Sequence, residues 1–197
     1  MKARRALGAW AALLPFLVLA AAARAGDEPR LKAGVFDPPR AAPEFSLRGS
    51  DGAELRLDRF RGKVVILEFG FTHCPAVCPT TLAALAGARK LLGAEAADLQ
   101  VVYITVDPER DDAPRLRTYL TAFDPTFVGG TGTPEQLAAV REAYGIAATR
   151  TPVGSSYGFD HSSYTYLIDR EGNLRALMPY GHSSDDYAHD ARILLKP

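Results

Sequence analysis

The stretch KVVILEFGFTHCPAVCPTTLAALAGARKLL, residues 63–92, predicts a strand, a turn that holds both cysteines of the chain, and a helix. Residues 63–71 form a mostly apolar run, as expected of a strand that is covered on both faces. After the turn, apolar residues recur at helical spacing, at Leu82, Leu85, Leu91 and Leu92. The stretch therefore predicts an α/β unit with its two cysteines at the point where the strand gives way to the helix.

Cys74 and Cys78 lie four residues apart at this turn, a spacing that places both sulfurs on one face of the helix start. A helix N-terminus favours anions, so it lowers the pKa of a thiol and produces the thiolate that attacks disulfides and binds soft metals. The pattern alone is compatible with a structural disulfide, a redox-active pair or a metal site. Thioredoxin-like redox proteins also place two cysteines in such a turn, with two rather than three residues between them.

The other elements predict a sandwich of helices around a mixed central sheet. Apolar residues alternate with polar ones on both sides of Asp51-Gly52, which predicts an extra N-terminal β-hairpin. Thr133 and Gln136 form a capping box, and Asp111 or Asp112 can cap the preceding helix. A second buried strand is expected at 99–107, a further hairpin around 170–172, and a last helix from 184 to 195. This order of elements indicates the α/β class.

The first 42 residues are predicted to lie outside the folded domain. Residues 1–25 combine a basic start, an apolar run and Ala23-Arg24-Ala25, the form of a signal peptidase site. An uncleaved anchor is the alternative, because an apolar run of about 18 residues is near the length that spans a bilayer. Residues 26–42 are rich in proline and predict a linker, which leaves 43–197 as the domain. We expect secretion across the inner membrane and a periplasmic location, either soluble or tethered by the N-terminal segment.

The charge balance argues against nucleic acid or an anionic membrane surface as the partner. The chain carries 23 basic and 23 acidic side chains, and residues 1–25 hold four of the basic ones and none of the acidic ones. Removal of that segment leaves 19 basic groups against 23 acidic ones, a net charge of about −4. A net negative charge repels polyanions.

Six motifs resemble the SCO/SenC family of copper-binding proteins, which share a thioredoxin-like fold. They are PEFSL, GKVVILEFGFTHCPAVCPTTL, VVYITVDPERD, FDPTFVGGTGTPEQ, AYGI and DHSSYTYLIDREG, in the expected order between about residues 43 and 178. In that family two cysteines and one distant histidine bind copper, and the matching residues here are Cys74, Cys78 and His161, the last in a loop. The chain departs from the family at Ala76, where many members carry an acidic residue, but this removes no ligand.

The resemblance implies a copper chaperone that serves assembly of the binuclear copper centre of cytochrome c oxidase. Two thiolates suit Cu(I), and an added imidazole makes a site that can also hold Cu(II). The sulfur pair must be reduced to load metal, so we expect redox-gated copper binding. Expected partners are the copper-site subunit of the oxidase and other periplasmic copper carriers, with the protein itself a monomer. The alternative is a thiol–disulfide oxidoreductase that reduces the cysteines of the oxidase copper site.

Glu68 interrupts the buried strand six residues before Cys74. Thioredoxins carry a buried acid at that offset, and it exchanges protons with their cysteine pair. The alternative is a carboxylate that reaches water at the end of the strand. A peroxiredoxin-like peroxidase is disfavoured, because its P-x-x-x-[ST]-x-x-C signature needs proline where this chain has Leu67 or Phe71.

Three further histidines and one acid are weaker candidates for the metal site. His73 adjoins the first cysteine, but its ring is expected to point away from the sulfur pair. His182 and His189 are seven residues apart and could share a helix face, although solvated side chains are the simpler expectation. Asp160 precedes His161 and could orient its ring or add a weak ligand.

Overall fold

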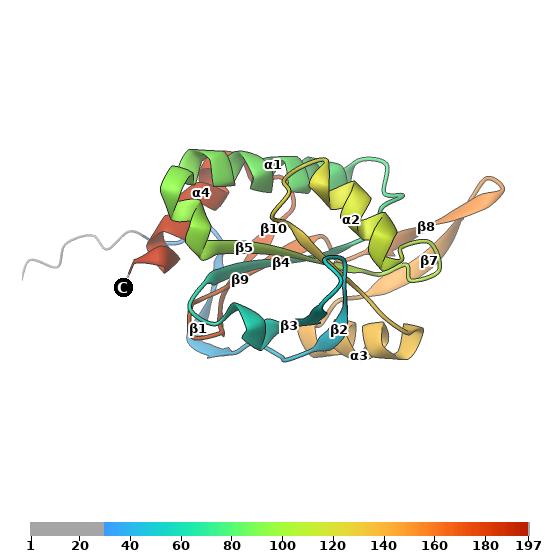
Figure 1. Cartoon of the computed structure of the whole chain (residues 1–197), viewed down its shortest axis with the longest axis horizontal. Coiled ribbons are helices and arrows are strands. Elements are labelled where there is room, and N and C mark those ends of the chain that lie inside the picture. The colour runs from blue at the N-terminus through green and yellow to red at the C-terminus, as the bar shows by residue number, and fades with distance from the viewer. Residues whose placement is uncertain (1–29, 197) are drawn as a thin grey trace, which may run out of the picture.

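In the computed structural model, which describes residues 30–196, an eight-stranded mixed sheet lies between two layers of helices. The strand order is β1-β10-β9-β4-β5-β6-β2-β3. Helices α1, α2 and α4 cover one face of the sheet and α3 covers the other (Figure 1). The strands of this sheet are β1 (Gly34–Ala41), β2 (Ser46–Gly49), β3 (Glu54–Arg56), β4 (Val64–Gly70), β5 (Leu99–Thr105), β6 (Val128–Thr131), β9 (Tyr164–Ile168) and β10 (Asn173–Pro179). The helices are α1 (Val77–Leu92), α2 (Ala113–Thr121), α3 (Pro134–Tyr144) and α4 (Ser184–Leu195), with 3-10 turns η1 (Leu57–Phe60) and η2 (Gly93–Asp98).

The centre of the sheet is parallel and one flank is antiparallel. β4 pairs in parallel with β5, and β5 in parallel with β6, whereas β9 runs antiparallel to β4. Every residue of β4 and β5 is buried, as the two apolar runs predicted for strands covered on both faces. The predicted α/β fold with a mixed central sheet is therefore confirmed.

Alternate residues of β4 point into two separate cores. Val64 and Ile66 pack against the layer formed by α1 and α4. Val65 and Leu67 pack on the opposite face, with α3 and the β2–β3 hairpin. By the same alternation, Glu68 faces the layer of α1 and α4.

The capping residues predicted from the sequence open their helices. The Thr133 hydroxyl accepts the N–H of Gln136, whose side-chain oxygen accepts the N–H of Thr133, and this capping box begins α3. Asp112 caps α2. Ser183 and Asp186 form a second capping box at the start of α4. The β2–β3 hairpin and the β9–β10 hairpin also form as predicted.

The predicted linker differs from the structure, because Gly34–Ala41 forms strand β1. β1 pairs with β10 at the edge of the sheet, so the folded domain begins before residue 43. Its residues are almost all exposed, so no apolar alternation marks the strand in the sequence. Pro38 and Pro39 fit here because an edge strand tolerates positions that donate no ladder hydrogen bond.

The chain just before β1 is also anchored to the domain. The buried carboxylate of Asp190, in α4, accepts the backbone N–H groups of Lys32 and Ala33, each at 2.9 Å. The Lys32 ammonium group pairs with Asp186 at 2.5 Å. Residues from 32 onward therefore belong to the domain and not to a free linker.

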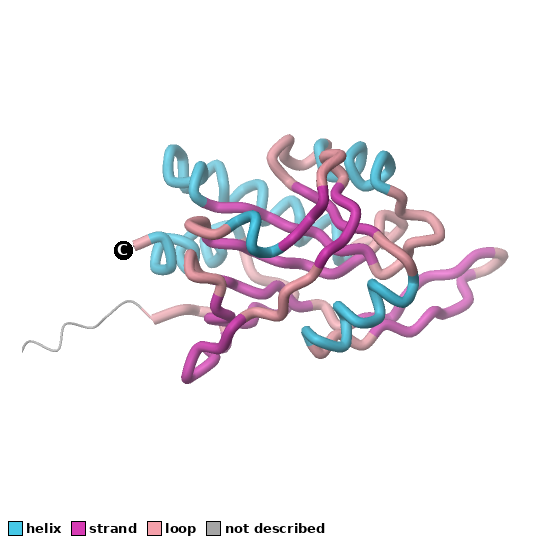
Figure 2. The backbone as a smooth tube through the Cα atoms, turned by 60° about the horizontal axis from the view of Figure 1, so that its bottom comes forward, coloured by secondary structure: helices cyan, strands magenta, loops and turns pink. Residues whose placement is uncertain are grey.

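A separate two-stranded sheet, formed by β7 (Ala148–Val153) and β8 (Ser156–His161), projects from one end of the sandwich (Figure 2). The sequence predicted a loop here, and the structure corrects this to a regular hairpin. Gly154, with φ of +58°, opens its turn. The strands have exposed and half-buried side chains without alternation, which explains why no strand was predicted.

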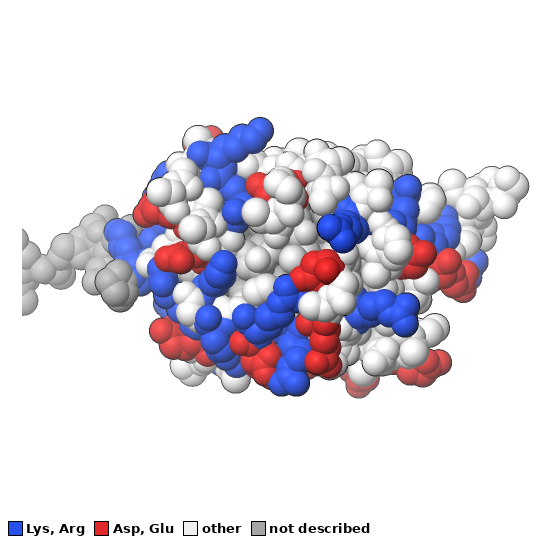
Figure 3. All heavy atoms as spheres, in the orientation of Figure 1, with Lys and Arg blue, Asp and Glu red and all other residues white. Residues whose placement is uncertain are grey.

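Within residues 30–196, no helix combines the length and apolar character needed to cross a membrane. The predicted signal segment, residues 1–25, lies outside the described residues. On the face shown in Figure 3, acidic and basic side chains are interspersed. Arg61, for example, pairs with Glu44 at 2.6 Å.

Candidate metal centre

Cys74 and Cys78 lie in the turn between β4 and α1. The helix begins at Val77, so Cys78 is in its first turn and Cys74 precedes it. The backbone N–H of Cys78 points at the sulfur of Cys74, with an N···S distance of 3.4 Å. Both thiols are free; Cys74 is half-buried, whereas Cys78 is 0% exposed.

Gly70, the last residue of β4, leaves the space that the Cys78 sulfur occupies. A Cβ atom at this position would lie 2.7 Å from that sulfur, closer than side chains approach one another. The N–H of Cys74 donates to the carbonyl of Phe71 at 3.2 Å and closes the turn. The glycine at the strand end is therefore needed for close approach, because its backbone passes directly beneath the sulfur.

The two thiols differ in acidity. A hydrogen bond from the Cys78 thiol lowers the pKa of Cys74 to about 5; the backbone N–H groups of Cys78, Ala76 and Val77 add to this effect, while partial burial opposes it. The same thiol–thiolate hydrogen bond raises the pKa of Cys78, and so do its burial and the negative charge of Glu68. At neutral pH the reduced pair therefore consists of a Cys74 thiolate and a Cys78 thiol.

His161 reaches the sulfur pair from the β7–β8 hairpin. It is the last residue of β8, and its Nε2 atom lies 3.9 Å from the Sγ atom of Cys78. Its Nδ1 atom lies 3.0 Å from the carbonyl oxygen of Ser162. Because a carbonyl only accepts hydrogen bonds, Nδ1 carries the proton and Nε2 presents its lone pair to the sulfur. The structure thus brings the three residues predicted as ligands together.

A surface pocket opens over this group. It is lined by Phe71, Cys74, Pro75, Ala76, Val77, Phe159, Asp160, His161 and Ser163. Asp160 is exposed and makes no hydrogen bond to His161 within residues 30–196, so the Ser162 carbonyl orients the ring instead. A soft metal held here would be reached through this pocket, whose rim includes Phe71, Pro75 and Phe159.

Glu68 lies behind the site and is 4% exposed. The sequence left two readings of Glu68 open, and the structure supports the buried acid over the carboxylate that reaches water. Burial raises the pKa of Glu68 well above its ordinary value, and the charge of Cys74 adds to this. Its Oε2 atom has no hydrogen-bond partner within the described part of the chain. A cavity of about 10 Å³, a volume that fits one water, lies between Glu68 and His161.

The other histidines point elsewhere. The Nδ1 atom of His73 lies 3.2 Å from the Thr72 hydroxyl, and within residues 30–196 no hydrogen bond joins His73 to either sulfur. His73 and two carboxylates, Asp107 and Asp111, have ligand atoms within 4.8 Å of one another, but both carboxylates already accept other hydrogen bonds. His182 and His189 each contact a different aspartate, Asp186 at 3.5 Å and Asp190 at 2.8 Å, so they do not form a joint site.

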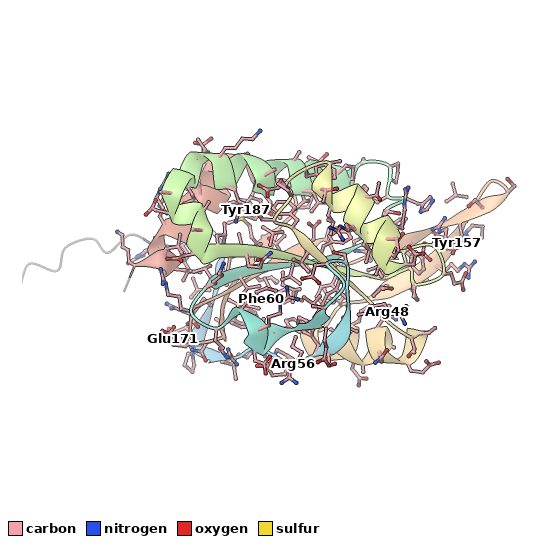
Figure 4. All side chains as sticks on the ribbon, viewed as in Figure 1. Arg48, Arg56, Phe60, Tyr157, Glu171 and Tyr187 are labelled. Atoms are coloured by element: carbon pink, nitrogen blue, oxygen red, sulfur yellow. The ribbon has the colours of Figure 1, made fainter. Side chains whose placement is uncertain are left out.

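The segment VDPERDD, residues 106–112, does more than the strand exit and helix cap that its sequence indicates. The Arg110 guanidinium group lies 3.7 Å from the centre of the Tyr157 ring and donates to the Tyr157 carbonyl oxygen at 3.0 Å. The Tyr157 hydroxyl donates to Asp107 at 3.0 Å. Tyr157 belongs to β8 and pairs with Pro152 near the turn of the projecting hairpin (Figure 4). We call Asp107, Arg110 and Tyr157 the hairpin clamp, because they hold the strand that carries His161.

The same segment holds the cysteine loop. Asp111 accepts the backbone N–H of Thr72 at 2.9 Å and its hydroxyl at 2.6 Å, and it also accepts the Thr105 hydroxyl at 2.7 Å. All three residues are buried. One short segment after β5 is therefore bonded both to the loop with the cysteines and to the hairpin with the histidine. Sequence reasoning missed this role because its signal, an Asp-x-x-Arg-Asp run after a strand, is the same as that of a helix cap.

Comparison with known proteins places these features in a family. The SCO1/SenC family profile matches residues 36–196. An SCO2-like protein of Rickettsia conorii is 36% identical over 132 residues, which cover 66% of this chain and 64% of that protein. The mitochondrial SCO1 homolog 1 of Arabidopsis thaliana is 38% identical over 143 residues, which cover 72% of this chain and 43% of that protein. The chain thus spans less than two thirds of the length of these relatives.

Solved structures of similar proteins have the same fold. ScoI of Arabidopsis thaliana with copper bound superposes with a TM-score of 0.72 at 35% identity, over 79% of this chain and 97% of that one. ScoI of Bradyrhizobium japonicum with copper bound gives 0.73 at 31% identity, over 78% and 99%. BsSco, described as a member of the Sco family of cytochrome c oxidase assembly proteins, has the same fold at 23% identity, with a TM-score of 0.64 over 83% of this chain and 98% of that one. With its thioredoxin-like fold, its cysteine turn and a profile match over most of its length, the chain belongs to the SCO1/SenC family.

Proposed function

We propose that this protein is a copper chaperone whose cargo is held by Cys74, Cys78 and His161. One observation carries the proposal: Cys74 and His161 line one pocket, and the buried Cys78 sulfur lies 3.9 Å from the same imidazole, 83 residues away in the chain. The imidazole is held in the tautomer that presents its Nε2 lone pair toward the Cys78 sulfur. The copper-bound structures of two relatives support copper as the metal.

The donor set suits a carrier that handles both oxidation states of copper. Two thiolates satisfy Cu(I), and the imidazole supplies the nitrogen donor that Cu(II) prefers. Cys74 and His161 line the open pocket, whereas the Cys78 sulfur is buried. We infer that an incoming ligand displaces Cys74 or His161 first and that Cys78 releases the metal last.

Copper loading would depend on the redox state of the cysteine pair. A disulfide between Cys74 and Cys78 consumes both thiolates at once, so the oxidised protein loses two of its three ligands. In the reduced protein Cys74 is already a thiolate at neutral pH, and only Cys78 has to give up a proton to the solvent when the metal binds.

The proposed recipient is the copper-site subunit of cytochrome c oxidase, and other periplasmic copper carriers are the proposed source of the metal. The family resemblance supports both, and the BsSco description as an oxidase assembly protein agrees with the recipient. We place the protein in the periplasm, with residues 1–25 as its secretion signal or its tether. The rim of the pocket, with Pro75, Ala76 and Phe159, would be the surface that meets the partner.

The second candidate function is thiol–disulfide exchange, and the asymmetry of the cysteine pair supports it. The half-buried Cys74 thiolate could attack a disulfide of the target, which forms a mixed disulfide and expels one target thiolate. Deprotonated Cys78 would then attack the Cys74 sulfur, release the second target thiolate and leave a Cys74–Cys78 disulfide. The two target thiolates gain the electrons that the pair loses, and they take up the protons it releases.

One experiment distinguishes the two functions. The reduced, copper-loaded protein is mixed with the metal-free, reduced copper domain of an oxidase subunit, and the absorption of the binuclear centre is followed. In parallel, the metal-free reduced protein is mixed with the disulfide form of that domain, and free thiols are counted. A chaperone transfers copper in the first arm, and His161→Ala weakens this transfer. Thiol release in the second arm without transfer in the first would make the protein a reductase.

A further inference from the structure

A row of polar side chains crosses the buried face of the sheet beneath Cys78. Glu68 on β4 is paired in register with Tyr103 on β5 and with Thr165 on β9, so the three side chains share one face. All three are buried in the core that faces α1 and α4. The Thr165 hydroxyl meets the hydroxyl of Tyr187, which points from α4 toward the sheet (Figure 4), at 3.1 Å.

Unlike Thr165, the Tyr103 hydroxyl has no hydrogen-bond partner within residues 30–196, although the residue is 0% exposed. Buried polar groups in folded proteins are nearly always paired, because the loss of water without a replacement partner is costly. Phenylalanine would fill the same space in the core without this cost, so the unpaired hydroxyl points to a role for the Tyr103 oxygen.

The hydroxyl of Tyr103 lies beside the sulfur of Cys78. A Cβ atom at Gly70 would lie 2.4 Å from the Tyr103 oxygen and 2.7 Å from the Cys78 sulfur. Both atoms thus border the same small space, which is open only because residue 70 is a glycine. In the metal-free structure the Tyr103 hydroxyl makes no hydrogen bond to this sulfur within residues 30–196.

Copper binding gives the Cys78 sulfur a negative charge that needs a hydrogen-bond donor. A thiol must lose its proton to become a metal ligand, and the Cys78 sulfur is buried where water cannot solvate its negative charge. A phenol is protonated at neutral pH and can donate one hydrogen bond. The buried sulfur then needs a donor, and the buried hydroxyl next to it lacks an acceptor.

We infer that Tyr103 donates a hydrogen bond to the Cys78 sulfur when that sulfur binds copper, and that this bond tunes the preference of the site for Cu(I) over Cu(II). The inference rests on the proposed copper function. Hydrogen bonds to a metal-bound sulfur favour the reduced metal, because the sulfur then retains more negative charge and donates less of it to the metal. Tyr103 would thus act through Cys78 without touching the metal.

The substitution Tyr103→Phe tests this, because it removes one oxygen atom and keeps the ring. In the Cu(II)-loaded variant, the sulfur-to-copper charge-transfer band should move to lower energy, since the sulfur electrons are no longer stabilised by the phenol. The ratio of Cu(I) affinity to Cu(II) affinity should fall by up to about tenfold, the upper end of what one ordinary intramolecular hydrogen bond contributes. Both affinities are measured by competition with chelators of known strength for each oxidation state.

Tyr119→Phe is the matched control. Its hydroxyl is also buried without a partner in the described structure, and its ring centre lies 6.2 Å from that of Tyr103. This variant should keep the wild-type band and affinity ratio. An unshifted band in Tyr103→Phe, or an equal shift in both variants, overturns the inference. These outcomes leave the proposed function intact if the wild-type protein binds copper; if it does not, both the function and the inference fail.

Discussion

The Nε2 atom of His161 lies 3.9 Å from the Sγ atom of Cys78, although 83 residues separate them in the chain. The helix start carries the sulfur and a projecting hairpin carries the imidazole, so the donor set is complete only while the two elements keep their relative position. Segment 106–112 bonds to both of them, through Asp111 on one side and the hairpin clamp on the other. The two sulfurs and the imidazole are therefore held by different contacts, so substitutions can alter the position of one without the other.

Loss of the imidazole should damage Cu(II) binding more than Cu(I) binding. In His161→Ala two thiolates remain, which satisfy Cu(I), whereas Cu(II) loses its nitrogen donor. We expect Cu(II) affinity to fall by more than the roughly 10–100-fold that loss of a ligand's supporting partner costs. Chelator competition in each oxidation state measures both changes. His73→Ala is the control, because that ring adjoins Cys74 but points to Thr72; equal losses in the two states for His161→Ala would contradict the assignment.

Loss of the hairpin clamp should imitate a weaker form of His161→Ala. Within residues 30–196, Arg110 contacts Tyr157, Asp107 and the ring of Phe71, at 6.0 Å, but none of the three proposed ligands, so Arg110→Ala should act on the metal through the hairpin and its packing. We expect a decrease in Cu(II) affinity of roughly tenfold, with Cu(I) affinity nearly unchanged. The split between oxidation states is the decisive readout, because general destabilisation would lower both affinities alike.

Arg150→Ala provides the matched control for the clamp. Arg150 lies 3.4 Å from the centre of the same Tyr157 ring, but it is half exposed and its ion-pair partner is the exposed Glu109. Exposed pairs of this kind contribute little, so this variant should bind copper as the wild type does. A Cu(II) loss as large as that of Arg110→Ala would show that the ring contacts, and not the hydrogen bonds of the clamp, hold the hairpin.

The sequence predicted best those elements whose signals are local. The capping box of Thr133 and Gln136 and the apolar run at 99–107 are such signals, and both features formed as predicted. β1 was missed because an exposed edge strand with two prolines has no buried face to produce a pattern. The clamp was missed because the contact between Arg110 and Tyr157 joins residues 47 positions apart, and the sequence around neither residue predicts it.

Alkylation of the reduced, metal-free protein should report the acidity of Cys74. Because the Cys74 pKa is lowered to about 5, its thiolate predominates above that pH, so the rate with iodoacetamide should stay level from pH 6 to 8 and fall as pH drops through 5. The free energy of unfolding also decreases as the pH falls. The stabilisation that accompanies the lowered pKa of Cys74 is complete above the ordinary pKa of a thiol and is lost as the pH falls toward 5. Cys78→Ala removes the largest cause, the thiol donor, and should move the rate profile to higher pH. A wild-type rate that still rises through pH 8 would refute the assignment.

Redox state should decide whether copper binds at all. The reduced protein should bind one copper ion per chain, and the Cys74–Cys78 disulfide form should bind essentially none, since one covalent bond removes both thiolate ligands. Equilibrium dialysis of the two forms against the same copper buffer measures this. Stoichiometric binding by the disulfide form would exclude the sulfur pair from the site. Treatment of that form with a reductant should restore binding, which excludes misfolding as the cause.

Glu68 should make the reduced protein less stable as pH rises, and Glu68→Gln should remove this dependence. The pKa of Glu68 is raised in the folded protein, whereas in the unfolded chain a glutamate ionises at about 4.3. Folding therefore retains a proton that the unfolded chain releases, so stability falls above that pH by up to about 1.4 kcal/mol per pH unit until the folded carboxyl ionises. Glu68→Gln should be more stable than the wild type at neutral pH. It should also exchange thiols with glutathione more slowly, because the buried carboxyl that could exchange protons with the cysteine pair is gone. Unfolding curves between pH 5 and 8 test the first effect, and exposed Glu171→Gln is the control. Parallel curves for Glu68→Gln and the wild type would mean that the carboxyl ionises in the folded protein as it does in the unfolded chain.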